Sequence, residues 1–148
     1  MKEKIAIVSD HAGFALKAIL KDEIEKLGYL AVDLGTKSEA SVDYPDFGYK
    51  LAKYITKGEA EFGVAICGSG IGISIAANRN PYIRAALCHS IETARLARQH
   101  NNANVLAIGA RIVDTNTAKA MLDTFLKTLF EGGRHIIRVE KLGNKQGE

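Results

Sequence analysis

The chain has 148 residues, of which 47% are hydrophobic and 25% are charged, and its formal net charge is +3 at neutral pH. This length and composition are typical of one globular domain with its own core, and they exclude a largely disordered chain. The basic residues alternate with acidic ones and form no long run, so the charge does not indicate a nucleic-acid partner.

The first part of the chain predicts two strand–helix units. Apolar runs over residues 4–9 and 29–34 are typical of buried strands. Each run is followed by a segment in which apolar residues recur at helical spacing, over 14–27 and over 45–58, and a glycine lies at the end of each segment. The polar stretch between the second strand and the second helix is expected to be a loop.

A strand, a glycine loop and a helix are predicted in the middle of the chain, over residues 62–78. Glycines at 68, 70 and 72 let the backbone approach a ligand closely. The helix that follows offers unpaired N–H groups and the positive end of its dipole, so the loop indicates an anion site. The Walker pattern is absent, and Ile73 stands where a cysteine phosphatase loop needs an arginine.

Cys67 lies at the turn of this loop, directly after the apolar strand. Backbone donors at such a position favour the thiolate, which would serve as a base or a nucleophile. The alternative is that Cys67 is a buried core residue, as many single cysteines are.

The last part predicts two more strands, over 83–87 and 105–108, each followed by a helix, and then an amphipathic tail segment over 134–142. Five strands alternating with helices predict an α/β fold: one doubly wound, Rossmann-like, three-layer αβα domain with a five-stranded parallel sheet. We expect this domain to span residues 1–148, with a C-terminal tail helix, over about 132–148, that packs at a subunit interface.

Membrane and secretion signals are not expected. No run of eighteen apolar residues occurs, and the chain passes from Met-Lys-Glu-Lys directly into a strand, so we expect no membrane partner and a cytoplasmic location. Cys67 and Cys88 are then free thiols, with Cys88 in the core.

Several polar residues follow predicted strands, where ligands bind in doubly wound folds. Asp10, His11, the loop after Cys67 and Arg111 are therefore expected at one edge of the sheet. Asp10 faces a substrate or only caps a turn. His100 precedes its strand, so topology does not fix its position, and it is either a general acid or a surface histidine.

Two arginines of the tail, Arg134 and Arg138, lie four residues apart and share a helix face. They either grip a phosphate together or belong to a solvated helix. Tyr44 is a phenol of the active site or an ordinary loop aromatic, and His135 is expected to be structural. The four histidines lack metal-binding spacing and no carboxylate cluster accompanies them in sequence, so no metal site is expected.

Six motifs in the same order, within residues 4–142, resemble the ribose-5-phosphate isomerase B family, which also contains isomerases of allose and galactose 6-phosphates. They are Ser9–Phe14, Asp43–Pro45, Cys67–Asn78, Arg98–Ala107, Gly109–Arg111 and Glu131–Arg138. The resemblance implies interconversion of ribose 5-phosphate and ribulose 5-phosphate through an enediolate, in the non-oxidative pentose phosphate pathway, without metal or organic cofactor.

The resemblance also implies roles for individual residues. Cys67 would move the proton between C2 and C1, and His100 would open the sugar ring. Position 69, a threonine in many relatives, is Ser69 and keeps the hydroxyl, and residues 71–76 lack the glutamate that one branch uses instead of the cysteine. Further sugar, enediolate and phosphate contacts would come from Asp10, His11, Tyr44, the backbone of Gly68, Ser69, Gly70, Ile71 and Gly72, and from Asn101, Arg111, Arg134 and Arg138.

The family works as homodimers, sometimes tetramers, with sites shared between subunits. Two alternatives to the ribose 5-phosphate isomerase remain open from the sequence. One is a preference for a six-carbon sugar phosphate, and the other is a protein that binds a sugar phosphate without catalysis.

Overall fold

The computed structural model of this chain describes residues 1–143, so the last part of the predicted tail, 144–148, lies outside the described residues. None of the helices in the described part has the length and hydrophobicity needed to cross a membrane. In chain order the elements are β1 (Lys4–Ser9), α1 (Phe14–Lys26), β2 (Leu30–Asp33), α2 (Tyr44–Thr56), β3 (Phe62–Cys67), α3 (Ile71–Asn78), β4 (Ala85–Leu87), α4 (Ile91–Asn101), β5 (Val105–Gly109), α5 (Thr115–Lys127) and α6 (His135–Leu142).

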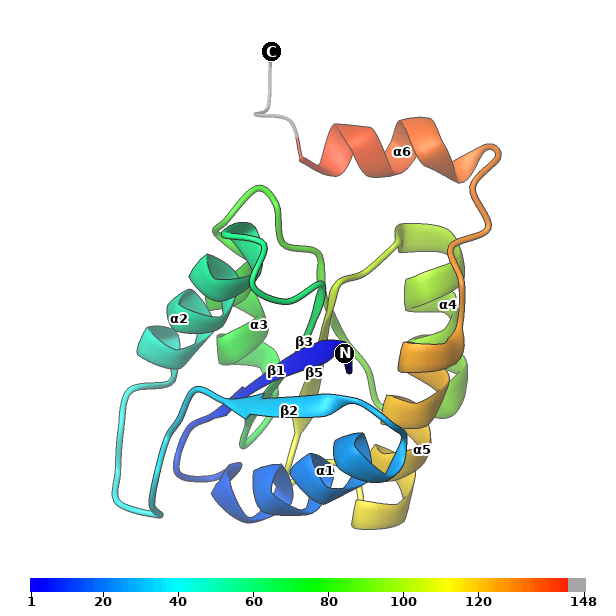
Figure 1. Cartoon of the computed structure of the whole chain (residues 1–148). Coiled ribbons are helices and arrows are strands. Elements are labelled where there is room, and N and C mark those ends of the chain that lie inside the picture. Colours follow the sequence, from blue (N-terminus) through cyan, green and yellow to red (C-terminus); the bar gives the residue numbers. More distant parts are fainter. Residues whose placement is uncertain (144–148) are drawn as a thin grey trace.

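The strands form one parallel, five-stranded sheet in the order β2-β1-β3-β5-β4. Helices cover both faces of the sheet, α2 and α3 on one and α1, α4 and α5 on the other (Figure 1). The predicted doubly wound, three-layer α/β fold is therefore confirmed.

The two edge strands are shorter than the sequence predicts. The amide of Tyr29 donates to the carbonyl of Ile24 and so completes the end of α1 instead of starting β2. The amide of Arg84 donates to the side-chain oxygen of Asn104 at 2.8 Å, which delays the start of β4. In both places the backbone amide of a residue that the apolar pattern assigns to a strand donates to a group outside the sheet, so the strand begins later.

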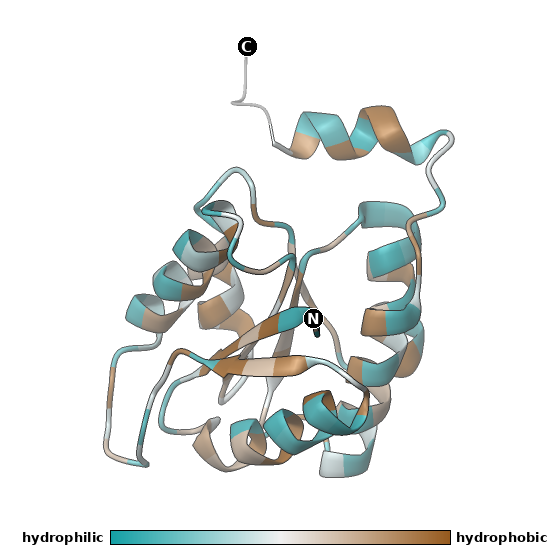
Figure 2. Ribbon diagram, viewed as in Figure 1, coloured by the Kyte–Doolittle hydropathy of each residue, from teal (hydrophilic) through white to brown (hydrophobic). Residues whose placement is uncertain are grey.

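The core is divided between the two faces of the sheet because successive strand residues point in opposite directions. Ile5 and Ile7 pack with α1, α4 and α5, whereas Ala6 and Val8 pack with α2 and α3. The apolar strands lie between helices whose outer surfaces are largely hydrophilic (Figure 2). This alternation determines, for each residue at the end of a strand, the face of the sheet toward which its side chain points.

The sheet has two distinct ends. We call the end where the strands finish the carboxyl edge, and the end where they begin the amino edge. Cys67 pairs with Gly109 at the carboxyl edge, whereas Gly63 pairs with Val105 at the amino edge. The amide of Gly63 also donates to the carbonyl of Asn104 at 2.9 Å, so the chain that leaves α4 reaches the sheet at the amino edge.

A buried arginine fixes the chain that follows α5 beside the end of α4. Arg98 Nε donates to the Thr128 carbonyl at 3.1 Å, and Nη1 donates to the Ala103 carbonyl at 2.7 Å. The amide of Glu131 donates to the carbonyl of Gln99 at 3.0 Å. As a result α6 lies beyond the end of α4, apart from the two helical layers (Figure 1).

Candidate active site

The glycine loop joins β3 to α3 at the carboxyl edge. Gly70 has a φ of 78°, a left-handed conformation that side chains rarely adopt. A Cβ on Gly70 would lie 2.6 Å from Leu87 Cδ1 and 2.8 Å from the amide nitrogen of Gly109. The close contact with β5 therefore requires glycine at this position for two independent reasons.

The sulfur of Cys67 faces this loop. Its Sγ accepts a hydrogen bond from the Gly70 amide at 3.2 Å. The residue is only 4% exposed and its side chain belongs to the apolar cluster under α2 and α3, but Gly68 and Ser69 beside it are half-buried. Cys67 thus combines both interpretations made from the sequence, because it is buried and it also faces the backbone donors of the loop.

The five loop amides differ in their availability. Those of Gly70 and Ile71 already donate, to Cys67 Sγ and to Ser69 Oγ at 3.1 Å. In the described part of the chain the amides of Gly68, Ser69 and Gly72 have no hydrogen-bond acceptor. These three amides can therefore bind a negatively charged oxygen without breaking an internal bond.

The residues after β1 lie next to the end of β3. Asp10 is buried, its amide donates to the Ile66 carbonyl at 3.1 Å, and its Oδ1 accepts the Gly13 amide at 3.1 Å. His11 Nδ1 accepts the Val42 amide at 3.1 Å, which leaves Nε2 as the hydrogen-bond donor of a neutral ring. Asp10 therefore stabilises the turn between β1 and α1, and it also lies beside the end of β3, which carries Cys67.

Tyr44 and Arg111 complete the group at the carboxyl edge. The Tyr44 ring lies against Gly72, where a Cβ would collide with it. The Arg111 amide donates to the Gly68 carbonyl at 3.0 Å, and its Nη1 would lie 3.0 Å from a Cβ on Gly68. The glycine loop is thus bordered by a phenol on one side and by a cation on the other.

Four other predicted site residues lie at the opposite end of the molecule. His100 and Asn101 form the end of α4, which precedes β5, and Arg134 and Arg138 are exposed on or directly before α6. The sheet therefore separates them from Cys67 within one chain. Topology left the position of His100 open, and the structure places it at the end of α4, before β5.

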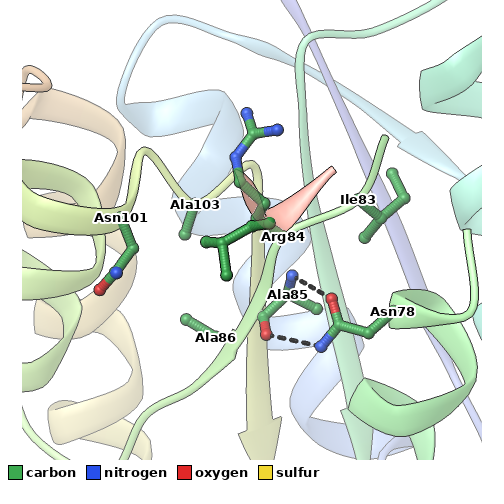
Figure 3. Close-up of a pocket in the computed structure, with 8 residues that line it drawn as sticks. Asn78, Ile83, Arg84, Ala85, Ala86, Asn101 and Ala103 are labelled. Carbon is green, nitrogen blue, oxygen red and sulfur yellow. Dashed lines mark hydrogen bonds between the residues drawn. The ribbon is translucent and has the colours of Figure 1, made fainter. Parts of the chain in front are cut away.

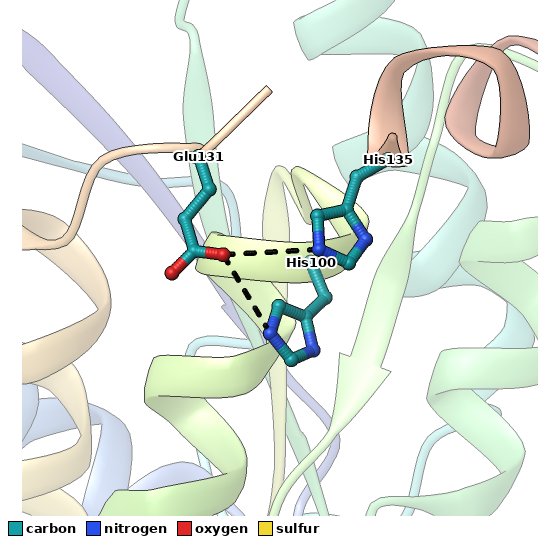
Figure 4. A group of neighbouring side chains, drawn as sticks. All are labelled: His100, Glu131 and His135. Atoms are coloured by element: carbon teal, nitrogen blue, oxygen red, sulfur yellow. Dashed lines mark ion pairs between the residues drawn. The ribbon is translucent and has the colours of Figure 1, made fainter. Parts of the chain in front are cut away.

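His135, expected from the sequence to be structural, is buried and lies against another histidine and a carboxylate. The ring of His135 stacks on that of His100, with centroids 4.4 Å apart and planes 13° apart. Glu131 Oε1 lies 3.8 Å from His100 Nε2 and 3.7 Å from His135 Nε2, so a carboxylate does accompany two histidines (Figure 4). Burial, together with the nearby charges of His100 and Arg134, lowers the pKa of His135.

A pocket of about 380 Å³ lies at the amino edge, far from the glycine loop. The side-chain amide of Asn78 closes one side by donating to the Ala85 carbonyl at 3.0 Å and accepting the Ala85 amide at 2.7 Å (Figure 3). Arg84, Asn101 and Leu142 also line it. Within one chain this pocket cannot serve the thiol of Cys67, because the sheet lies between them.

Comparison with known proteins identifies the family. A family model described as Ribose/Galactose Isomerase matches residues 5–142. Ribose-5-phosphate isomerase B of Escherichia coli is 44% identical over 140 residues, which are 95% of this chain and 94% of that protein.

Solved structures agree with this comparison. The structure of ribose-5-phosphate isomerase B from Clostridium thermocellum is 51% identical with a TM-score of 0.93, and the match covers 95% of each chain. The enzyme from Mycoplasma genitalium, solved with bound ribulose-5-phosphate, is 42% identical with a TM-score of 0.91 over 96% of this chain and 95% of that one.

Proposed function

Because this chain belongs to the ribose/galactose isomerase family, we propose that the isomerisation it catalyses interconverts ribose 5-phosphate and ribulose 5-phosphate, with Cys67 as the base. The observation that carries this proposal is the position of Cys67 Sγ, 3.2 Å from the Gly70 amide and beside three loop amides without an internal acceptor. A relative solved with ribulose-5-phosphate supports a sugar phosphate as the ligand.

In the proposed reaction the Cys67 thiolate takes the proton from C2 of the open-chain aldose. The electron pair of the broken C–H bond gives an enediolate with its negative charge on the C1 oxygen. The thiol then returns the proton to C1, while the proton of the C2 hydroxyl passes to the C1 oxygen, so the ketose forms with no net change in atoms or electrons. Proton removal next to a carbonyl needs such a positioned base.

The loop amides and Ser69 support this chemistry. N–H groups fixed where negative charge develops stabilise the enediolate more than the neutral sugar. Because Ser69 Oγ accepts the Ile71 amide, its own proton can be donated to a sugar oxygen. Asp10, Tyr44 and Arg111 border the same loop and are proposed to contact the sugar.

We further propose that a complete site needs two copies of the chain. His100 and Asn101, and the phosphate ligands Arg134 and Arg138, lie at the amino edge, whereas the thiol lies at the carboxyl edge. A two-fold dimer that joins the carboxyl edge of one copy to the amino edge of the other would form two composite sites.

Exposed apolar residues at both edges are consistent with such a dimer. Ile71 and Ile75 of α3 are exposed near the glycine loop, and Ile136 and Ile137 of α6 are exposed at the amino edge. Apolar surface that forms a contiguous patch marks a site of association, and a dimer of this kind would bury these four side chains. In that arrangement His100 would open the sugar ring, and His11 would join the two arginines at the phosphate.

The test is the Cys67→Ala variant, with Cys88→Ala as the matched control because both thiols are buried near strand ends. Loss of the base should lower kcat by at least about 100-fold and abolish deuterium exchange at C2 of ribose 5-phosphate, followed by NMR, while phosphate affinity changes little. Unchanged turnover in Cys67→Ala would exclude Cys67 as the base. Comparison of kcat/KM on ribose 5-phosphate and allose 6-phosphate would test the preference for a five-carbon sugar.

A further inference from the structure

The cluster of His100, Glu131 and His135 at the amino edge offers more than the proposed reaction uses. Each of these side chains offers one ligand atom, and the three atoms lie within 4.8 Å of one another (Figure 4). We propose that these three side chains form a binding site for a divalent transition-metal ion, for which zinc is the best match.

The donor set fits zinc. Two imidazoles and one carboxylate are a common set of protein ligands for this ion, which leaves the fourth position to water. Zinc bonds to such atoms are about 2.0 to 2.2 Å long, so the ligand atoms of a tetrahedral site lie roughly 3.4 Å apart. The distances of 3.7 and 3.8 Å from Glu131 Oε1 to the two Nε2 atoms are close to that value.

The movement that binding requires falls on the exposed side chains. The two ring planes are stacked and only 13° apart, so an ion in the plane of one ring lies outside the plane of the other, and one ring must tilt for both to bind it. The side chains of His100 and Glu131 are 38% and 50% exposed and have space to turn, whereas that of His135 is 9% exposed. His135 is therefore the fixed ligand, and the other two adjust to it.

An independent observation also points to a ligand at this position. His135 Nε2 is buried and has no hydrogen-bond partner within the described residues, although it faces Glu131. Buried polar atoms are nearly always paired, because an unpaired one loses its hydration without compensation. A bound ion would pair this nitrogen and neutralise the neighbouring carboxylate.

The backbone around the cluster holds the ligands in place. The Glu131 amide donates to the Gln99 carbonyl at 3.0 Å, directly before His100, and the His135 amide donates to the Gly132 carbonyl at 3.1 Å. Arg98 fixes the preceding segment through Thr128. Such supporting hydrogen bonds hold the ligands in place before the ion binds, so less conformational entropy is lost on binding and the metal affinity is higher.

Binding of zinc would have a consequence that rests on the proposed function. His100 would be held by the metal and could no longer assist ring opening, so zinc should inhibit the isomerase. Glu131 takes no part in the proposed reaction, and its replacement should relieve that inhibition.

The experiment is a calorimetric titration of the untagged protein with zinc chloride in the absence of sugar phosphate. Glu131→Gln should lower the affinity at least tenfold, and His135→Gln should do the same. Glu140→Gln, which removes the same charge from α6, and His89→Gln, which removes an exposed imidazole elsewhere, should bind like the wild type. Glu131 is exposed, so its variant provides the comparison even if replacement of the buried His135 impairs folding.

Cobalt ions provide a second measurement, because they broaden the NMR signals of nearby rings. The His100 and His135 signals should broaden first, and that of the exposed His89 should remain sharp. Equal zinc affinity in the wild type and in Glu131→Gln would overturn the proposed site. Zinc binding that depends on Glu131 but leaves isomerase activity unchanged would confirm the metal site and contradict the role proposed for His100.

Discussion

At the scale of single residues, Lys17 is the most enclosed charge among residues 1–143, with only 1% of its surface exposed. Its Nζ donates to Asp33 Oδ1 at 2.6 Å and to the Thr36 carbonyl at 2.7 Å. Burial alone would raise the pKa of Asp33, but the hydrogen bonds from Lys17, the Gly35 amide and Lys21 outweigh burial and hold that pKa below its usual range. The group ties the end of β2 to α1, so it joins an edge strand to the core.

The low pKa of Asp33 predicts how stability depends on pH. A carboxyl group with a lower pKa in the folded state than in the unfolded state stabilises the fold above the unfolded value of about 3.9. This contribution is lost as pH falls through the folded value. Asp33→Asn should therefore lower the free energy of unfolding at pH 7 and flatten its decrease below about pH 4, measured by urea denaturation.

Asp22 provides the control for this measurement, because it is an exposed aspartate in α1, the helix that also carries Lys17. Asp22→Asn should reproduce the wild-type curve of stability against pH. An Asp33→Asn protein with the same steep loss at low pH as the wild type would show that other carboxyl groups control acid unfolding.

At the scale of elements, the turn between β3 and α3 links stability to catalysis through Gly70. A side chain at this position would be strained by the φ of 78° and would also collide with Leu87 and β5. Gly28 has a comparable φ of 95°, but a Cβ there would meet nothing within 4 Å. Substitution of Gly28 therefore measures the backbone strain alone, whereas substitution of Gly70 measures the strain together with the steric collision.

Gly28→Ala should cost about 1 kcal/mol of stability from backbone strain and leave kcat unchanged. Gly70→Ala should cost clearly more, and it should also lower kcat, because the amide that donates to Cys67 Sγ must move. Thermal unfolding and steady-state kinetics of the two variants test this difference. Equal effects of both substitutions on stability and rate would mean that the loop contact with β5 does not matter.

Element positions followed well from the sequence, for identifiable reasons. Apolar periodicity is local, so the helices and the central strands were predicted closely, and the glycine loop was predicted from residues 68–72 alone. The contact of Glu131 with His100 was missed because the two residues are 31 positions apart in the chain. They meet only because Arg98 binds the Thr128 carbonyl and so holds the segment before Glu131 against α4. A spacing of four between Glu131 and His135 was the only sequence signal for that group.

At the scale of the whole molecule, the division of the proposed site residues between two edges has the largest consequences. Cys67 and its loop lie at the carboxyl edge, and His100 and the two arginines lie at the amino edge, so the proposed site would need both edges. Sequence could indicate that these residues act together, but not which chain supplies them, because motif order carries no information on assembly. In the proposed dimer, burial of the exposed isoleucines of α3 and α6 would favour association.

A mixed dimer tests this division directly. Cys67→Ala and His100→Asn chains should each form inactive homodimers, since every site in them lacks one of the two groups. If sites are composite, a dimer of the two variants contains one site with both defects and one site with none. Random reassociation of equal amounts makes about half of the dimers mixed, so activity should recover to about a quarter of the wild-type value.

If instead each chain used its own Cys67 and His100, every site in the mixture would keep one defect, and no activity would return. The recovery should fall to zero when both substitutions are placed in the same chain and that chain is mixed with itself. When the doubly substituted chain is mixed with the wild type, both sites of each mixed dimer carry one defect in the composite case. Activity should then drop to about a quarter of that of an all-wild-type sample with the same total number of chains, whereas sites built within one chain would retain about half.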